Sequence, residues 1–313
     1  MDGHGHGTHV SGIVAGKSFG VAKKATIIAV KILDDTGSGD DFGVVLGIEY
    51  VIWRRKKHGR PSVINMSIGG PVAKVLNDAV VRAYKAGVYT VVSAGNEWMD
   101  ACYSSPASAK LAITVGASDF NDQRSWFSNY GKCVDVFAPG SRIVSVVPPG
   151  LFKGPTEMWD GTSMAAPHVA GALAVIMAQK PGLYADIQNG IVDFLNIATR
   201  NQIFDVRMTV NRVLYLNLNN VPMKGELPAP VFSNVSMSAI ENGGEGVTVT
   251  ESGTGSTVPI VASVGLVGLL VIAAAIFSIV KRKKNVKEKE YLVDAIPELS
   301  SSDQIVDLQS SRV

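Results

Sequence analysis

The pattern of apolar residues between positions 62 and 93 restricts the possible folds more than any other feature of the sequence. An apolar run at 62–68 ends in two glycines, and a segment with helical spacing at 72–85 leads to a second apolar run at 88–93. A strand, a helix and a strand in this order place the two strands parallel in one sheet. We therefore predict an α/β fold with a mostly parallel central sheet and a functional site at the carboxyl ends of its strands.

Other segments of the chain extend this pattern. We expect further strands at residues 26–33, 111–116 and 212–216. Because it is rich in β-branched residues, the first of these suits a strand that is buried on both faces. We expect further helices at residues 42–57, 162–180 and 184–198.

Composition excludes several classes of function. The net charge is only +2, so no global charge points to nucleic acid or to acidic partners. Four consecutive cations at 54–57 come before Gly59, and this arrangement is typical of a helix C-terminus. Two cysteines are too few for a disulfide-dense miniprotein or a zinc module.

The segment 160–171, with the sequence D-G-T-S-M-A-A-P-H-V-A-G, places Ser163 at the start of an apolar helix. Pro167 is tolerated if it lies in the first turn, where an N–H has no helical partner. A serine is a weak nucleophile unless a base removes its proton and donors stabilise the oxyanion. Two glycine-flanked residues are candidates for these roles: His6 as the base and Asn96 as the donor.

The N-terminal end contains two patterns that could indicate a different site. His4, His6 and His9 do not indicate a metal centre, because histidine ligands usually act with an acidic or cysteine partner in fixed geometry. The D-T-G sequence at 35–37 occurs in aspartic proteases, but that chemistry needs a second carboxylate of the same kind, and no second motif occurs. We interpret the acidic loop 34–41 as a substrate-binding rim.

Three motifs, G-H-G-T-H-V-x-G, A-G-N-E and G-T-S-M-A-A-P-H-V-A-G, occur in this order. Together they resemble the subtilase family of serine endopeptidases. The resemblance covers residues 1–219 and implies a subtilisin-like three-layer fold. Its proteinase K branch is matched at residues 20–26, 63–67, 105–108 and 127–131.

The resemblance also implies roles for individual residues. Ser163 would be the nucleophile, His6 the base and Asn96 an oxyanion donor, with no cofactor needed for catalysis. Protein or peptide substrates would bind as an extended strand with broad specificity. The walls of the substrate pocket would be formed by Ser67, Ile68, Gly69, Ser93, Ala94 and Gly95.

Two structural features follow from the same resemblance. Cys102 and Cys133 match a disulfide of some proteinase K-like enzymes. Asp135 matches an aspartate that binds a structural calcium ion together with two carbonyl oxygens, which would here belong to Lys110 and Ala112. Lys110 stands where that pattern has proline, although its carbonyl oxygen is still a suitable hard ligand.

In the family a catalytic aspartate precedes the histidine motif, whereas only Met1 to Gly5 precede His6 here. We therefore expect a sheet that lacks its first strand or strands, and a chain that is nearly or wholly inactive as it stands. The alternative function is a catalytically inactive, truncated subtilase fold that serves as a binding ectodomain, or an incomplete gene model.

The composition changes after residue 219. Residues 220–257 are rich in Gly, Ser, Thr, Pro and Glu, and we interpret them as a flexible stalk. Residues 258–280 form an uncharged apolar run of 23 residues, long enough to span a membrane, and four cations follow at 281–284. We predict a single-pass membrane protein with an extracellular or lumenal catalytic domain and a cytosolic tail at 281–313.

Overall fold

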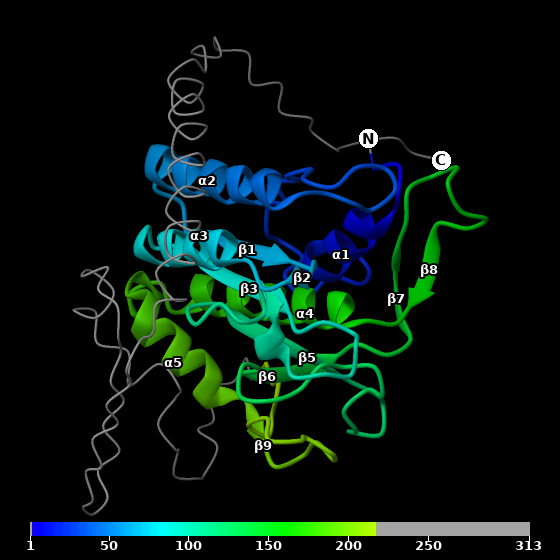
Figure 1. The fold of residues 1–313 in the computed structure, drawn as a ribbon. Helices are drawn as coiled ribbons and strands as arrows, with labels where there is room; N and C mark the ends of the chain where they lie inside the picture. Colours follow the sequence, from blue (N-terminus) through cyan, green and yellow to red (C-terminus); the bar gives the residue numbers. More distant parts are fainter. Residues whose placement is uncertain (1, 217–313) are drawn as a thin grey trace, which may run out of the picture. The chain divides into compact units, whose positions relative to one another are not determined.

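The computed structural model describes residues 2–216, and these contain a six-stranded sheet. Its strands, in spatial order, are β1 (Val63–Met66), β3 (Tyr89–Ser93), β5 (Ile113–Ser118), β6 (Val136–Pro139), β10 (Arg212–Val213) and β9 (Thr199–Arg200) (Figure 1). All neighbours pair in parallel except β9, which is antiparallel to β10. The predicted α/β fold with a mostly parallel sheet is confirmed.

Helices cover both faces of the sheet, so residues 2–216 form three layers (Figure 1). On one face, Val91 packs with residues of α4 (Thr162–Gln179) and α5 (Ile187–Ile197). On the other, Val92 packs with α2 (Asp41–His58) and α3 (Lys74–Lys85). Successive strand residues point to opposite faces, which explains why β3 is buried along its whole length.

The helix α2 begins and ends where its sequence indicates. The Asp40 side chain accepts a hydrogen bond from the Gly43 N–H at 2.7 Å and caps the N-terminus. Gly59 takes a left-handed conformation with φ of 65° and donates its N–H to the Arg55 carbonyl. The cations of the last turn therefore lie at the negative end of the helix dipole, as predicted.

Shorter elements surround the sheet. The helix α1 (His6–Ala15) packs against α4 and against β7 (Ile143–Val146), which forms a hairpin with β8 (Thr156–Trp159). The remaining elements are β2 (Gly70–Pro71), which pairs with β4 (Ser104–Ser105), and the short helices η1 (Ala101–Tyr103) and η2 (Leu183–Ala185).

The strand predicted at 26–33 is not formed. This segment has no regular secondary structure, and Ile27 and Ile28 are 42% and 49% exposed. It lies against α2 instead: a Cβ on Gly47 would come within 2.8 Å of the Ile32 side chain. A strand needs a hydrogen-bonding neighbour, and no strand within residues 2–216 lies beside this segment.

The C-terminal predictions have mixed outcomes. The last predicted strand is shorter than expected, since β10 covers Arg212–Val213 alone. The stalk, the membrane span and the tail lie outside the described residues. Within residues 2–216, the structure contains no helix with the length and apolar character needed to cross a membrane.

Candidate active site at the carboxyl edge of the sheet

The ends of β1 and β3 bring two of the predicted segments together. The strands pair in parallel up to Met66 and Val92, so the residues that follow each strand lie side by side. The Ser93 hydroxyl donates to the Ile68 carbonyl at 3.1 Å and links the two segments directly. At Gly69, a Cβ would meet no atom within 4 Å, so the backbone there is open to an approaching ligand.

The nitrogen atoms of two N–H donors lie near one point beside Gly161, just before α4. A Cβ on Gly161 would lie 3.5 Å from the Ser163 nitrogen and 3.7 Å from the Asn96 side-chain nitrogen. The Asn96 side-chain oxygen accepts the Thr162 N–H at 2.8 Å and the Thr162 hydroxyl at 2.9 Å. These bonds turn the Asn96 nitrogen toward the first turn of α4, where helical N–H groups lack partners. The arrangement suits an anionic oxygen.

The loop that carries Asn96 is held by Asn129, a residue that sequence reasoning did not single out. Asn129 is fully buried, its side-chain nitrogen donates to the Ala94 carbonyl at 2.9 Å, and its side-chain oxygen accepts the Met99 N–H at 3.0 Å. Its own N–H donates to the Gly95 carbonyl. The only signal in the sequence was its position within the segment 127–131, noted above for its resemblance.

Ser163 is the second residue of α4 and is half-buried. Its hydroxyl donates to the Ser67 carbonyl over a long 3.4 Å, and the Ser67 hydroxyl donates to the Ser163 carbonyl at 2.8 Å. Pro167 lies inside the helix, beyond the first turn, so the first-turn explanation for this proline was wrong. Because Pro167 has no N–H, the Ser163 carbonyl lacks its usual helical donor, and the Ser67 hydroxyl bonds it instead.

His6 is the first residue of α1, which packs against α4. Its ring lies parallel to Trp159, with centroids 6.4 Å apart, and Trp159 also stacks on His9 at 4.4 Å. Burial lowers the pKa of His6, and the neighbouring His4 and His9 lower it further. The neutral imidazole, which is able to accept a proton, is therefore favoured.

Within residues 2–216, no hydrogen bond joins the His6 ring to Ser163 or to a carboxylate. The Asp2 carboxylate instead accepts the N–H groups of Gly5 and Thr8 at 2.8 Å each, and so binds the start of α1. Asp35 pairs with Lys31 at 2.9 Å. A Cβ on Gly37 would lie 2.9 Å from the His4 ring, so the acidic loop lies beside the segment that leads to His6.

The other histidine of the motif has a structural environment. His9 is fully buried, and its Nε2 lies 3.1 Å from the Glu157 carbonyl oxygen, which links α1 to β8. In the part of the chain that the structure describes, no three His, Cys, Asp or Glu side chains are grouped as they would be around a metal ion.

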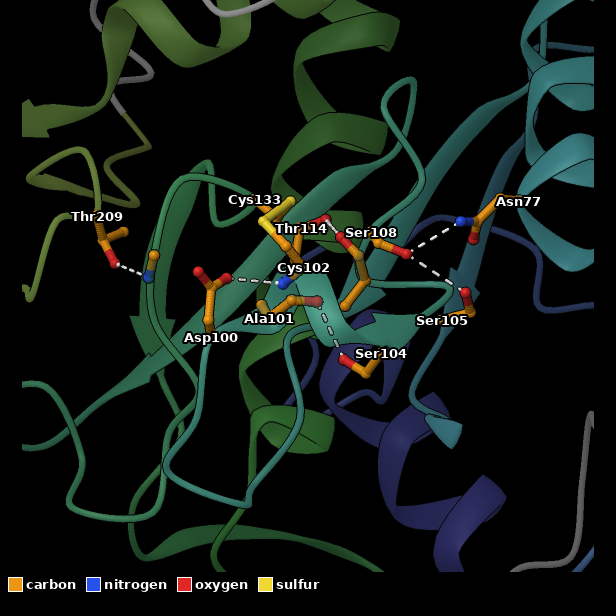
Figure 2. The surroundings of a disulfide bond; sticks show 12 residues. Asn77, Asp100, Ala101, Cys102, Ser104, Ser105, Ser108, Thr114, Cys133 and Thr209 are labelled. Atoms are coloured by element: carbon orange, nitrogen blue, oxygen red, sulfur yellow. Dashed lines mark hydrogen bonds between the residues drawn. A yellow bond between two sulfur atoms is a disulfide. The ribbon is translucent and has the colours of Figure 1, made fainter. Parts of the chain in front are cut away.

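Figure 2 shows the disulfide between Cys102 and Cys133, whose Cα atoms are 5.4 Å apart. The bond joins η1, in the loop after β3, to the segment that leads into β6. The Asp100 carboxylate accepts the Cys102 N–H at 2.9 Å and shapes this turn. The predicted pairing is confirmed.

Asp135 lies next to this disulfide in sequence and is buried. One carboxylate oxygen accepts the Thr114 N–H at 2.8 Å, and the other makes no hydrogen bond with any described residue. Burial raises the pKa of Asp135 to about 7. An unbonded carboxylate oxygen is a hard ligand of the kind that calcium takes, so Asp135 itself is compatible with the predicted ion.

A serine at a helix N-terminus, with N–H donors nearby at the carboxyl edge of a parallel sheet, is the arrangement that serine hydrolases use. The family model described as "Subtilase family" matches residues 1–202. The chain therefore belongs to the subtilase family.

Individual relatives agree with this family. The subtilisin-like serine protease pepC of Aspergillus niger is 47% identical over 192 residues, covering 58% of this chain and 36% of pepC. Cerevisin of Saccharomyces cerevisiae is 42% identical over 234 residues, covering 69% of this chain and 36% of cerevisin. The chain thus spans little more than a third of the length of these relatives.

A solved structure supports the same fold. The crystal structure of a cold adapted subtilisin-like serine proteinase superposes with a TM-score of 0.64 at 41% identity. The match covers 69% of this chain and 76% of the chain in that structure.

Proposed function

We propose that this protein is a serine endopeptidase in which Ser163 attacks the peptide carbonyl. His6 accepts the proton of the Ser163 hydroxyl and then donates it to the leaving amine. The Ser163 N–H and the Asn96 side chain bind the oxyanion. The observation that carries this proposal is that the nitrogen atoms of these two donors lie near one point beside Gly161.

The mechanism requires the Ser163 hydroxyl to turn from the Ser67 carbonyl toward His6. The present hydrogen bond from the Ser163 hydroxyl to the Ser67 carbonyl is 3.4 Å long, which is longer than is usual for an O–H donor. Little free energy is therefore lost when the hydroxyl rotates away from that carbonyl. Peptide substrates bind as an extended strand between the segments after β1 and β3. Recognition is then mainly through the main chain, and specificity is broad.

Labelling with a fluorophosphonate probe tests the proposal on the full chain. The wild type should be labelled slowly, as expected of a chain without a triad carboxylate, and Ser163→Ala should abolish the signal. Ser62→Ala is the matched control, because among the described residues the hydroxyl of half-buried Ser62 bonds only the Arg60 carbonyl. Labelling that persists in Ser163→Ala would remove Ser163 from the mechanism.

One observation favours a second candidate, a catalytically inactive binding domain. Among residues 2–216, no carboxylate forms a hydrogen bond with the His6 ring, and loss of such a partner lowers kcat by about 10⁴ in comparable triads. A folded full chain that binds peptides but is not labelled supports this candidate.

We also propose that residues 258–280 anchor the protein in a membrane, with the catalytic domain extracellular or lumenal. The uncharged run and the cations at 281–284 support this topology. In sealed vesicles, an epitope placed after Val313 should be digested by added protease while the catalytic domain is protected. The reverse pattern would overturn the topology.

We further propose that Asp135, with the carbonyl oxygens of Lys110 and Ala112, holds a structural calcium ion. The unbonded carboxylate oxygen of Asp135 and its burial support this role. The ion would supply positive charge that keeps Asp135 ionised.

A further inference from the structure

The helix that carries Ser163 contains a proline at a position that normally supplies a donor. In an α-helix, each N–H bonds to the carbonyl four residues earlier, so residue 167 would serve the carbonyl of Ser163. Pro167 has no N–H. It is buried inside α4, where an unpaired carbonyl is costly. The carbonyl of Ser163 therefore needs a donor from outside the helix.

The Ser67 hydroxyl is that donor. It lies 2.8 Å from the Ser163 carbonyl oxygen, and Ser67 is only 7% exposed. The Ser67 oxygen also accepts a hydrogen bond from the Asn65 side chain at 3.0 Å. A hydroxyl has a single proton to donate, so this second bond leaves the proton directed at Ser163.

The contact joins two elements that are far apart in sequence. Ser67 follows β1, and Ser163 lies in the first turn of α4. Because the bonded carbonyl belongs to Ser163 itself, the contact fixes the peptide group that follows this residue. The orientation of the Ser163 side chain depends on that peptide.

We propose that Ser67 is a positioning residue for Ser163, because its hydroxyl supplies the hydrogen bond that Pro167 cannot make. The inference rests on the proposed function, and it adds to the role of Ser67 in the substrate pocket wall. The two roles differ in their kinetics. Loss of a wall contact raises KM, whereas loss of positioning lowers kcat.

A double-mutant cycle on the full chain tests the inference. Ser67→Ala should lower kcat and the fluorophosphonate labelling rate about tenfold, with KM nearly unchanged. Pro167→Ala restores an N–H opposite the Ser163 carbonyl. In the Pro167→Ala background, Ser67→Ala should lower kcat by less than about twofold, because the restored helical hydrogen bond replaces the one that Ser67 made. An equal loss in both backgrounds would overturn the inference, as would a tenfold rise in KM at constant kcat.

The same cycle is measured by urea unfolding, which requires no enzymatic activity. Ser67→Ala should lower the unfolding midpoint in the wild-type background and lower it less in the Pro167→Ala background. Ser104→Ala is the matched control: it removes a 3.1 Å bond from a hydroxyl to the Ala101 carbonyl, and its effect should add independently to that of Pro167→Ala. If the wild type is not labelled, the proposed function fails. Additive unfolding effects of Ser67→Ala and Pro167→Ala contradict the inference whether or not labelling occurs.

Discussion

The side-chain amide of Asn129 forms two hydrogen bonds with Glu97, the residue after Asn96. The amide nitrogen donates to the Glu97 carboxylate at 2.8 Å, and the amide oxygen accepts the Glu97 N–H at 3.0 Å. Together with its bonds to Ala94 and Met99, these contacts use all the donors and acceptors of the amide. Asn129 therefore fixes the loop that presents Asn96.

We predict that Asn129→Asp destabilises the protein. The change replaces two N–H donors with a carboxylate oxygen facing the Ala94 carbonyl and the Glu97 carboxylate. We expect a loss of about 3 kcal/mol in the free energy of unfolding at neutral pH. The loss should be smaller in acid, where the introduced carboxyl group is protonated and can again donate a hydrogen bond. Urea unfolding at several pH values measures this.

The control for this change is Asn121→Asp, which alters an exposed side chain in the same way. Its effect should stay within about 0.5 kcal/mol. Equal effects of the two substitutions would contradict the clamping role of Asn129.

In the pH profile of the fluorophosphonate labelling rate, His4→Gln should move the acidic limb to higher pH. Burial lowers the pKa of His6, and the charge of His4 lowers it further, so removing that charge raises the pKa. His6 then becomes protonated, and unable to act as a base, at a higher pH than in the wild type. Labelling rates measured between about pH 5 and pH 8 test this. His58→Gln, at the exposed end of α2, should leave the limb in place.

Removing the disulfide should destabilise the native state. Cys102 and Cys133 are 31 residues apart, and closing a loop of this size contributes about 3–4 kcal/mol in the chain-entropy treatment. The double variant Cys102→Ser/Cys133→Ser should unfold at lower urea concentration than the wild type. Adding a reductant should lower the wild-type midpoint toward that of the variant and leave the variant unchanged. Identical midpoints in non-reducing buffer would show that the bond contributes nothing.

Without calcium, Asp135 should make stability depend on pH. Its folded-state pKa of about 7 exceeds the value of about 3.9 in an unfolded chain. The folded state therefore holds the proton more tightly, and the stability gained below about pH 4 is lost as pH rises through about 7. Asp135→Asn keeps an acceptor for the Thr114 N–H but has no charge. Urea unfolding in a chelator should show this loss in the wild type and not in the variant.

Calcium should reverse this behaviour if the ion binds as proposed. It favours the ionised carboxylate, so the wild type should gain stability with added calcium at neutral pH, and Asp135→Asn should not. If the stability of the wild type does not change when calcium is added, the proposed ion is contradicted, while the prediction of pH-dependent stability still stands.

Local patterns in the sequence determined much of this protein. The crossover from β1 through α3 to β3 was predictable because strand and helix periods repeat within a few residues. The ends of α2 were predictable because Asp40 and Gly59 cap it locally. The motifs around His6, Asn96 and Ser163 identified the family for the same reason, since each is a short continuous string.

The tertiary structure alone decided the rest. Residues 26–33 have the composition of a strand, but a strand depends on a neighbour that no local pattern reveals. Pro167 was expected in the first turn, and its position inside α4 became tolerable through the hydroxyl of Ser67, which is distant in sequence. Asn129 likewise acts on a loop that lies well before it in the chain. The hydrophobic period of an element and the residues that cap it are short-range properties of the sequence. A strand edge or a buried carbonyl, in contrast, needs a hydrogen-bonding partner, and the fold supplies that partner from a residue that is distant in sequence.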